Sequence, residues 1–442
     1  MHVPDGFINA PVSVAAGVVA AGAVAVSLRG ARRELTGGTG PLSPPAPQST
    51  TGSAAPPTPA SGTGGERTAP LAGLVAAFIF AVQMLNFPVA AGTSGHLLGG
   101  ALAAILVGPY TGLLCVSVVL LMQGVLFADG GLTALGVNIV DMGVVTVLVA
   151  YGIFRGLLRV LPRGRSAVTG ASFVAALVSV PAAAVVFTGM YAVGGTADVA
   201  LGKVFAAMTG VHVLIGIGEA AITAATVGAV IAVRPDLVYG ARDFTAKPLE
   251  LRTAHVAAPG DGAPAPNTAP APNTAPAPNT APAPNTAPAP DAVPAPREDT
   301  TDAAPAPVPV PADSAPAAPA RTGRTVRGLW IGGLAATVIC AGVVSFYASA
   351  SPDGLEKVAA DNGIDKKAED HAAEDSPLAD YGVASIADAR LSGGLAGVIG
   401  AGATLAAGSA VFVAVRRRRE SAPAAASADS AAPPAPSSRE TT

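Results

Sequence analysis

Histidines are the residues in this sequence that most directly suggest chemistry. Three of the five, His2, His96 and His212, stand near the ends of apolar stretches, and the other two, His255 and His371, lie in polar segments where we expect exposure to solvent. Imidazole is the side chain that most often binds transition metals. Three histidines at one end of neighbouring helices would therefore predict a metal site.

The position of His2 as the second residue is the most specific of these features. The α-amine of Met1, the amide nitrogen of His2 and its imidazole Nδ1 can close two small chelate rings in one plane. A fourth nitrogen from elsewhere would complete a square, which suits Ni²⁺ or Cu²⁺ and is open to low-spin Co²⁺. The bulky second residue should also protect Met1 from removal. The alternative is that His2 is an ordinary exposed histidine.

The other two histidines have structural alternatives as well. His96 lies in a glycine-flanked segment at 93–100, and it could bind a metal or form a hydrogen bond to a neighbouring helix. His212 opens the last apolar stretch before residue 240, with Glu219 two turns further on, and a buried structural role is as open as a transport role. We interpret other polar residues in or near the apolar stretches mainly as hydrogen-bonding groups between helices: Gln83, Asn86, Gln123, Asn138 and Asp141.

The composition predicts a protein that contacts lipid. Half of the 442 residues are apolar, 12% are charged, and the mean hydropathy is +0.51. A soluble domain usually carries about 25% charged residues, so lipid must replace water over much of the surface. The net charge of −3 gives no basic excess for nucleic acid. Cys115 and Cys340 lie in apolar stretches, and we interpret them as buried free thiols.

Seven apolar stretches precede residue 240, and a membrane span needs about 20 residues. The third is short, and only the turn signal at 108–112 separates it from the fourth; one long bent segment is the alternative. Basic residues follow the first, fifth and seventh stretches, which predicts an N-terminus outside the cell. No basic residue precedes the first stretch, so we do not expect a secretory signal. The stretches cover roughly 10–28, 70–88, 95–107, 109–128, 135–159, 166–192 and 207–233.

Two further apolar stretches, at about 327–350 and 392–415, predict a membrane hairpin near the C-terminus. Basic residues flank both outer ends of this hairpin, so we expect the C-terminus in the cytoplasm and the acidic segment 351–391 outside. The fold class is therefore an all-α integral membrane protein. It combines a bundle of seven helices with a C-terminal two-helix hairpin.

The composition also divides the chain into regions. Residues 1–240 form the predicted membrane domain, with a disordered insert rich in Pro, Gly, Ser and Thr at 36–69. Residues 241–320 form a Pro- and Ala-rich linker that cannot bury enough apolar surface to fold. The two-span module occupies 321–420, and 421–442 is a disordered tail.

Several catalytic motifs are missing from the sequence. It contains no G-x-x-x-x-G-K-[ST], so it does not bind ATP through a P-loop, and no H-E-x-x-H. No G-x-S-x-G nucleophile motif stands out either. We therefore expect a protein that is not an enzyme and has no resident cofactor.

The spaced motifs of residues 1–240 resemble the CbiM/NikM family, the substrate-specific components of cobalt and nickel energy-coupling factor transporters. The resemblance covers residues 1–35 and 70–240. It implies a metal site built from the Met1 amine, the His2 amide and imidazole, and His96, with Asn86, His212 and Glu219 in support. The segments that carry it are MHVPDGF at 1–7, NFPV at 86–89, GTSGHL at 92–97, Gln123 with FADGG at 127–131 and GVN at 136–138, and HVLIGIGEA at 212–220.

The C-terminal module also resembles a known family. SPDGLEK at 351–357 and SPLADY at 376–381 are similar to the PDGLE domain, which is compared with the auxiliary component CbiN/NikN. From the sequence we expect this module to assist transport without supplying primary ligands, because its one histidine, His371, lies in an acidic loop. The insert at 36–69 lengthens the usual connection between the first two spans, on the side away from the metal.

Together these resemblances imply a multi-pass protein of the cell membrane that imports Co²⁺ or Ni²⁺. The implied partners are membrane lipid, a CbiQ/NikQ-like transmembrane coupling protein and two CbiO/NikO-like ATPase subunits. A membrane metalloenzyme with histidine ligands and a membrane assembly scaffold are the alternatives. The choice between cobalt and nickel stays open, because the same nitrogens accept either ion.

Overall fold

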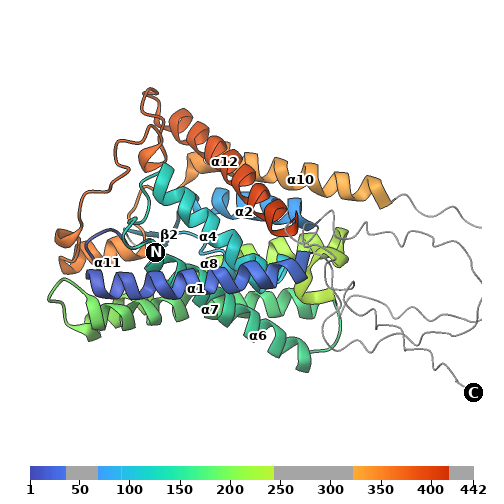
Figure 1. Cartoon of the computed structure of the whole chain (residues 1–442), viewed down its shortest axis with the longest axis horizontal. Helices are drawn as coiled ribbons and strands as arrows, with labels where there is room; N and C mark the ends of the chain where they lie inside the picture. The colour runs from blue at the N-terminus through green and yellow to red at the C-terminus, as the bar shows by residue number, and fades with distance from the viewer. Residues whose placement is uncertain (36–67, 91, 243–321, 418–442) are drawn as a thin grey trace, which may run out of the picture. The chain divides into compact units, whose positions relative to one another are not determined.

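The computed structural model describes residues 1–35, 68–90, 92–242 and 322–417 (Figure 1). The linkers at 36–69 and 241–320 and the tail at 421–442 lie almost entirely outside these residues, so their disorder stays a prediction. The described parts of residues 1–247 and 321–442 belong to one compact unit. The C-terminal module therefore packs on the N-terminal region.

Helices form most of the N-terminal region (Figure 1). A two-stranded antiparallel sheet interrupts them, made of β1 (Phe87–Ala90) and β2 (Thr93–Gly95). Two short 3₁₀ helices, η3 (Pro235–Leu237) and η4 (Tyr239–Ala241), follow the last long helix. In chain order the helices are α1 (Ala10–Leu35), α2 (Thr68–Gln83), α3 (Gly100–Val107), α4 (Pro109–Leu126), α5 (Leu135–Asn138), the π-helix η2 (Ile139–Val145), α6 (Thr146–Val160), α7 (Arg165–Gly194) and α8 (Leu201–Val233).

Seven helical stretches of the described residues are long and apolar enough to cross a membrane. Five lie in the N-terminal region: α1, α4, the continuous stretch Leu135–Val160, α7 and α8. Large apolar side chains point outward from α1, where Val14 is 67% and Val18 is 68% exposed. Such a surface is stable in lipid rather than in water. The predicted all-α integral membrane fold is confirmed.

The second and third predicted spans are shorter than the sequence suggested. The apolar part of α2 is Pro70–Gln83, and α3 has eight residues. Both are short because the sheet and the irregular residues 96–99 occupy the chain between them. The predicted turn between the third and fourth stretches is confirmed. Gly108, with φ +98°, separates α3 from α4, and the two helices pack closely where Gly112 meets the backbone of Ala103 and Ala104.

A buried carboxylate fixes this turn against the first helix. Glu34, near the end of α1, accepts hydrogen bonds from the backbone N–H groups of Tyr110 (3.2 Å) and Thr111 (2.7 Å) at the start of α4. The first N–H groups of a helix lack partners within it and favour a negative charge. Arg155 of α6 likewise donates to the carbonyl of Gly240 (3.2 Å), beyond α8. The basic ends of α1, α6 and α8 are thus tied to neighbouring segments.

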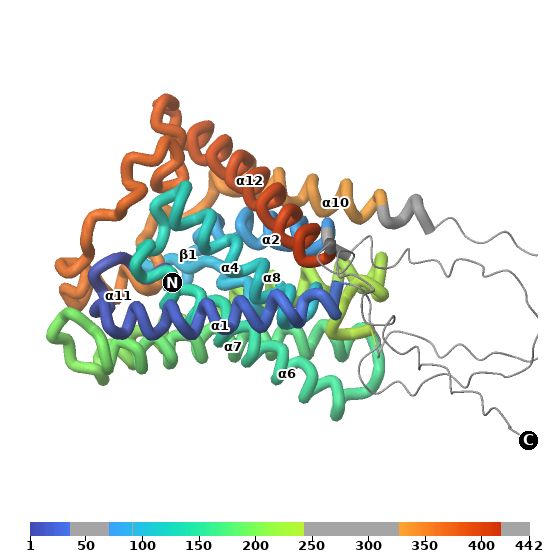
Figure 2. Tube along the Cα trace, in the orientation of Figure 1, coloured from blue at the N-terminus to red at the C-terminus, as the bar shows by residue number. Residues whose placement is uncertain are grey.

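The C-terminal module contains α10 (Thr322–Gly342), the 3₁₀ turn η5 (Val344–Tyr347), α11 (Gly354–Asn362), two further 3₁₀ turns and α12 (Ala389–Arg417). Both long helices, α10 and α12, lie beside α2 (Figure 2). Small residues permit this packing: Gly73 of α2 faces Ser409 of α12, and Gly333 of α10 faces Leu74. The predicted two-helix hairpin is confirmed, and its connecting segment reaches the chain start (Figure 1).

Candidate metal centre

The first residues of the chain form a buried segment. Met1 is 1% exposed and Val3 is fully buried. The N–H of Val3 donates to Asn138 Oδ1 (2.8 Å), and its carbonyl accepts from Asn138 Nδ2 (3.2 Å) and from the Gly131 N–H (2.9 Å). Asp5 accepts two further backbone N–H groups of the same loop. The segment between α4 and α5 therefore fixes the position of the chain start.

His96 follows β2 and begins an irregular segment that leads to α3. The carboxylate of Glu219 accepts the N–H groups of Leu98 (2.6 Å) and Gly99 (3.2 Å), and Gln83 Nε2 donates to the Leu98 carbonyl (2.8 Å). Non-helical backbone within a membrane bundle is tolerated only where protein groups satisfy it. Glu219 and Gln83 do so here, and they hold His96 in place.

The structure brings the three predicted ligands together. The Met1 amine lies 2.6 Å from His96 Nε2, and the rings of His2 and His96 stack with centroids 4.9 Å apart and planes inclined by 11°. His96 Nδ1 is 3.0 Å from the carbonyl oxygen of Leu97, to which a protonated nitrogen donates. That bond leaves the lone pair of Nε2 facing Met1. Burial and the Met1 ammonium lower the pKa of His96, which favours this neutral form.

Asp129 holds the imidazole of His2. Its Oδ1 lies 2.8 Å from His2 Nδ1, and its Oδ2 accepts from the Tyr381 hydroxyl (2.6 Å). Burial alone would raise the pKa of Asp129, but the nearby His2 and these hydrogen bonds lower it to about 2. Nδ1 is the nitrogen that the predicted chelate requires, so the ring is turned away from the chelating arrangement. Among the described residues, His2 Nε2 has no hydrogen-bond partner.

A residue of the C-terminal module reaches the same place. Asp353 Oδ2 lies 2.7 Å from the Met1 amine and 3.4 Å from His96 Nε2. Burial would raise the pKa of Asp353, but the Met1 ammonium and His96 hold it well below its usual range. Asp353 is 6% exposed. The sequence analysis did not place any residue of this module among the ligands.

Two sets of contacts hold Asp353 in position. Its Oδ1 accepts from the N–H of Glu356 (2.8 Å), and Glu356 Oε2 accepts from the Asp353 N–H (2.9 Å), which forms a capping box at the start of α11. The backbone before it is bound to β2, because the Pro352 carbonyl accepts from the N–H of Ser94 (2.9 Å). Gly354 lies against α8 near His212, where a side chain would collide. Strand β2 thus precedes His96 directly and also binds the segment that carries Asp353.

The remaining predicted site residues border this centre. His212 is fully buried on α8, with Nδ1 2.7 Å from the Met208 carbonyl oxygen. Its Nε2 has no hydrogen-bond partner among the described residues. The carbonyl of Asn86 accepts from the N–H of Ser349 (2.7 Å), so the loop before β1 binds the C-terminal module. Among the described residues, neither the His212 nor the Asn86 side chain forms a hydrogen bond with the Met1 amine.

The expectation that His371 is solvated is wrong. The ring is half-buried, with Nε2 3.2 Å from the Gly130 carbonyl oxygen, while Nδ1 accepts from the N–H of Ala373 (2.9 Å). The connecting segment of the module folds back onto the loop after α4, which the sequence did not indicate. His255 lies outside the described residues.

A cavity of about 290 Å³ opens beside His2. Pro4 and Phe7 of the chain start line one part of it, and Pro352 and Glu356 of the C-terminal module line another. His2 itself lines this cavity, and the walls come from both regions of the protein.

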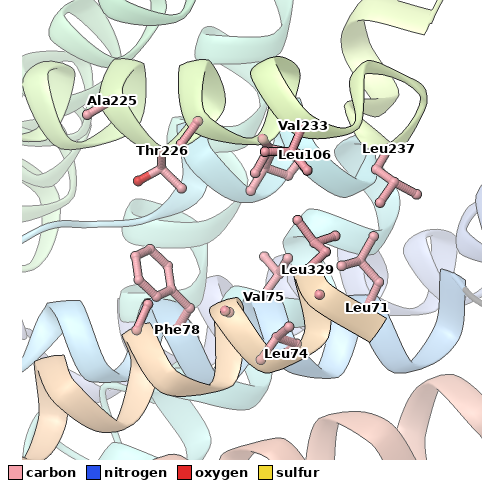
Figure 3. A pocket seen from close by; sticks show the side chains of 16 residues that line it. Leu71, Leu74, Val75, Phe78, Leu106, Ala225, Thr226, Val233, Leu237 and Leu329 are labelled. Atoms are coloured by element: carbon pink, nitrogen blue, oxygen red, sulfur yellow. The ribbon is translucent and has the colours of Figure 1, made fainter. Parts of the chain in front are cut away.

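A second cavity, of about 730 Å³, lies between α2, α8 and α10 (Figure 3). Its lining is apolar except for the hydroxyl of Thr226, so it offers no ligand for a metal ion. Among the described residues, no three His, Cys, Asp or Glu side chains form a metal-binding cluster by themselves. A metal centre at Met1, His2 and His96 would therefore need backbone nitrogens as well.

Comparison with known proteins agrees with the sequence resemblance. Residues 60–237 match the family described as "CbiM: Cobalt uptake substrate-specific transmembrane region". A relative from Haloquadratum walsbyi, provisionally named a metal transport protein, is 37% identical over 239 residues, which cover 54% of this chain and 94% of that protein. The chain belongs to this family. Residues 327–417 of the CbiM-family chain also match the PDGLE domain.

Other relatives of this CbiM-family chain are named as fused nickel transport proteins, NikMN. The protein from Archaeoglobus fulgidus carries this name provisionally. It is 43% identical to this chain over 44% of this chain and 62% of its own length. The one from Rhodobacter capsulatus is 35% identical over 35% of this chain and 36% of its own length. A crystal structure of a truncated transition metal transporter aligns with 23% identity and a TM-score of 0.41, over 52% of this chain and 99% of that one.

Proposed function

We propose that this CbiM-family chain captures Co²⁺ or Ni²⁺ at Met1, His2 and His96 and serves as the substrate-binding component that carries the ion across the cell membrane. The observation that carries this proposal is the 2.6 Å separation of the Met1 amine and His96 Nε2, beside the stacked ring of His2. Relatives named as nickel and cobalt transport proteins support the choice of ions.

The contacts suggest how the site takes up an ion. The Met1 ammonium is paired with Asp353, and His2 Nδ1 is bound to Asp129. On loading, the amine and the His2 amide would lose protons, and the His2 ring would turn so that Nδ1 leaves Asp129. His96 Nε2 then completes the nitrogen square. Binding therefore releases protons.

We further propose that the chain start faces outside and the C-terminus faces the cytoplasm. The basic residues at the ends of α1, α6 and α8 support this orientation, because cytoplasmic ends of spans carry an excess of Lys and Arg. The cavity beside His2 then opens on the outer side, from which the ion is captured.

The chain itself carries out no bond-breaking step in this proposal. It has no P-loop motif, so the energy for transport would come from partner ATPases joined through a transmembrane coupling protein, as the family resemblance implies. Asn86, His212 and Glu219 act in support. Glu219 does so by satisfying the backbone after His96.

Metal titration of the purified full chain tests the proposal. We expect one Co²⁺ or Ni²⁺ ion per chain, and about 10- to 100-fold weaker binding in His2→Ala and in His96→Ala, which each remove a donor. His371→Ala is the matched control, because it removes an imidazole from the same end of the protein without removing a predicted ligand. Equal affinities for the wild type and His96→Ala would refute the proposal.

A further inference from the structure

The position of Asp353 raises the question of where its carboxylate goes when the site is loaded. It accepts a hydrogen bond from the Met1 amine and lies near His96 Nε2. Both nitrogens are donors in the proposed function. An ion bound between them must therefore either displace Asp353 or bind it.

The geometry points to binding: we propose that Asp353, supplied by the C-terminal PDGLE module, is an oxygen ligand of the transported ion. This inference rests on the proposed function and extends its donor set from four nitrogens to four nitrogens and one carboxylate oxygen. Asp353 lies outside residues 60–237, which match the CbiM family.

The three atoms have the spacing of donors around one ion. Met1 N, His96 Nε2 and Asp353 Oδ2 are separated by 2.6, 2.7 and 3.4 Å. For donors about 2.1 Å from a divalent ion, two ligands at right angles lie about 3.0 Å apart, and the observed separations bracket that value. One ion can therefore lie about 2.1 Å from all three atoms without moving any of them.

The carboxylate is also oriented before any ion arrives. Oδ1 is engaged with the N–H of Glu356, which fixes the rotamer and leaves Oδ2 directed at Met1 and His96. Ser94 binds the backbone of Ser351 and Pro352 on one side. A ligand held by its own second contacts loses little freedom when it binds the metal.

The charge of the buried site supports the same role. Before loading, the Met1 ammonium and the Asp353 carboxylate cancel. After loading, the dipositive ion would contact one deprotonated amide and the same carboxylate, so the charges of the groups in contact with the ion again cancel; Asp129, which binds His2, lies outside this set. Unpaired charges are costly to bury. Asp353 therefore supplies the counter-charge in both states, whereas a neutral residue there would leave the loaded centre with an excess positive charge.

Substitution at Asp353 tests this role. Asp353→Asn keeps a good N-cap residue for α11 and removes the charge, so the helix should form as before. Asp361→Asn is the matched control, because it removes the same charge from the same helix at an exposed position. Both are compared with the wild type as purified full chains titrated with Co²⁺ and Ni²⁺, and the X-ray absorption edge of the bound ion reports its coordination number.

We expect five ligands in the wild type and in Asp361→Asn, and four in Asp353→Asn, with metal binding weakened at least about 10-fold. Unchanged or tighter binding in Asp353→Asn would overturn the inference, since it would show that the carboxylate is displaced. Four ligands in the loaded wild type would overturn it whether or not the variant folds. Failure of the proposed function looks different: the wild type itself would show no binding that depends on His2 and His96.

Discussion

One residue added before Met1 is the most direct perturbation of the proposed centre. The Met1 amine is buried and contacts His96 Nε2 at 2.6 Å and Asp353 Oδ2 at 2.7 Å. An extension converts this amine into an amide, which is a much weaker donor unless it also loses its proton. A further residue adds about 3.8 Å of chain. The Met1 amine is in direct contact with His96 and Asp353, so there is no room for this residue between them. The chain start must then leave its position between the two side chains.

The structure gives a magnitude for this change. The extension moves the positive charge one residue away from the Asp353 carboxylate, and the loss of one partner of a buried ion pair costs about 3–5 kcal/mol. Part of that cost is recovered if the Asp353 segment opens to solvent. The loss of one nitrogen donor adds to the effect on the ion. We therefore expect metal affinity to fall by at least about 100-fold while the helices remain inserted.

The assay compares the chain that starts at Met1 with a chain carrying one additional glycine before it. Both are purified from membranes and titrated with Co²⁺ and Ni²⁺, and circular dichroism checks that the helical content is the same. A glycine inserted in an exposed turn, after Pro162, controls for a general effect of lengthening the chain. Normal affinity in the extended chain would refute an amine ligand and the chelate built on it.

Three further predictions address the support, the protonation and the orientation of the site. Glu219→Gln leaves one of the two backbone N–H groups of Leu98 and Gly99 without an acceptor. Thermal unfolding should therefore show a free energy of unfolding that is lower by about 1–3 kcal/mol, and metal binding should weaken. Titrations at several pH values should show binding that weakens on acidification. Because burial and the Met1 ammonium lower the pKa of His96 from 6.5, protons should compete at this ring only below that pH. In a background without Cys115 and Cys340, an impermeant thiol reagent on intact cells should label Asp361→Cys and not Ser166→Cys, and the reverse pattern would exclude an outward chain start.

The long helices could be predicted from the sequence because a helix that spans a membrane requires a long run of apolar residues. Apolar stretches of about 20 residues and flanking basic residues located α1, α7 and α8, and Gly108 with Pro109 located the turn between α3 and α4. The lengths of α2 and α3 could not be predicted in the same way. The segment between them is also largely apolar, yet it forms a sheet and an irregular stretch whose backbone groups are bound by Glu219 and Gln83.

The candidate ligands could be predicted because their chemistry depends on position in the chain. The second residue is a histidine, and with the Met1 amine and its own amide nitrogen it offers a possible chelate. The partners of these ligands could not be found, because they are contacts between distant segments. Asp353 and Glu356 form the capping box of α11 in the structure. Nothing in the local sequence indicates that the other carboxylate oxygen of Asp353 contacts Met1, 352 residues earlier. The same holds for Asp129, which turns His2 Nδ1 away from the chelate.

The proposed donors lie on loops and their supporting residues on helices, which suits a site that must both bind and release an ion. Each residue that contacts the proposed ion belongs to a chain end or a loop: Met1 and His2 to the chain start, His96 to the segment after β2, and Asp353 to the segment before α11. The groups that hold them, such as Glu219 and Gln83, belong to helices. A shift of one loop would change the donor set without unfolding a helix, because Glu219 and Gln83 bind backbone groups beside His96 rather than its imidazole. A site built wholly on helices would bind as well, but it could release the ion only by moving the spans that carry it.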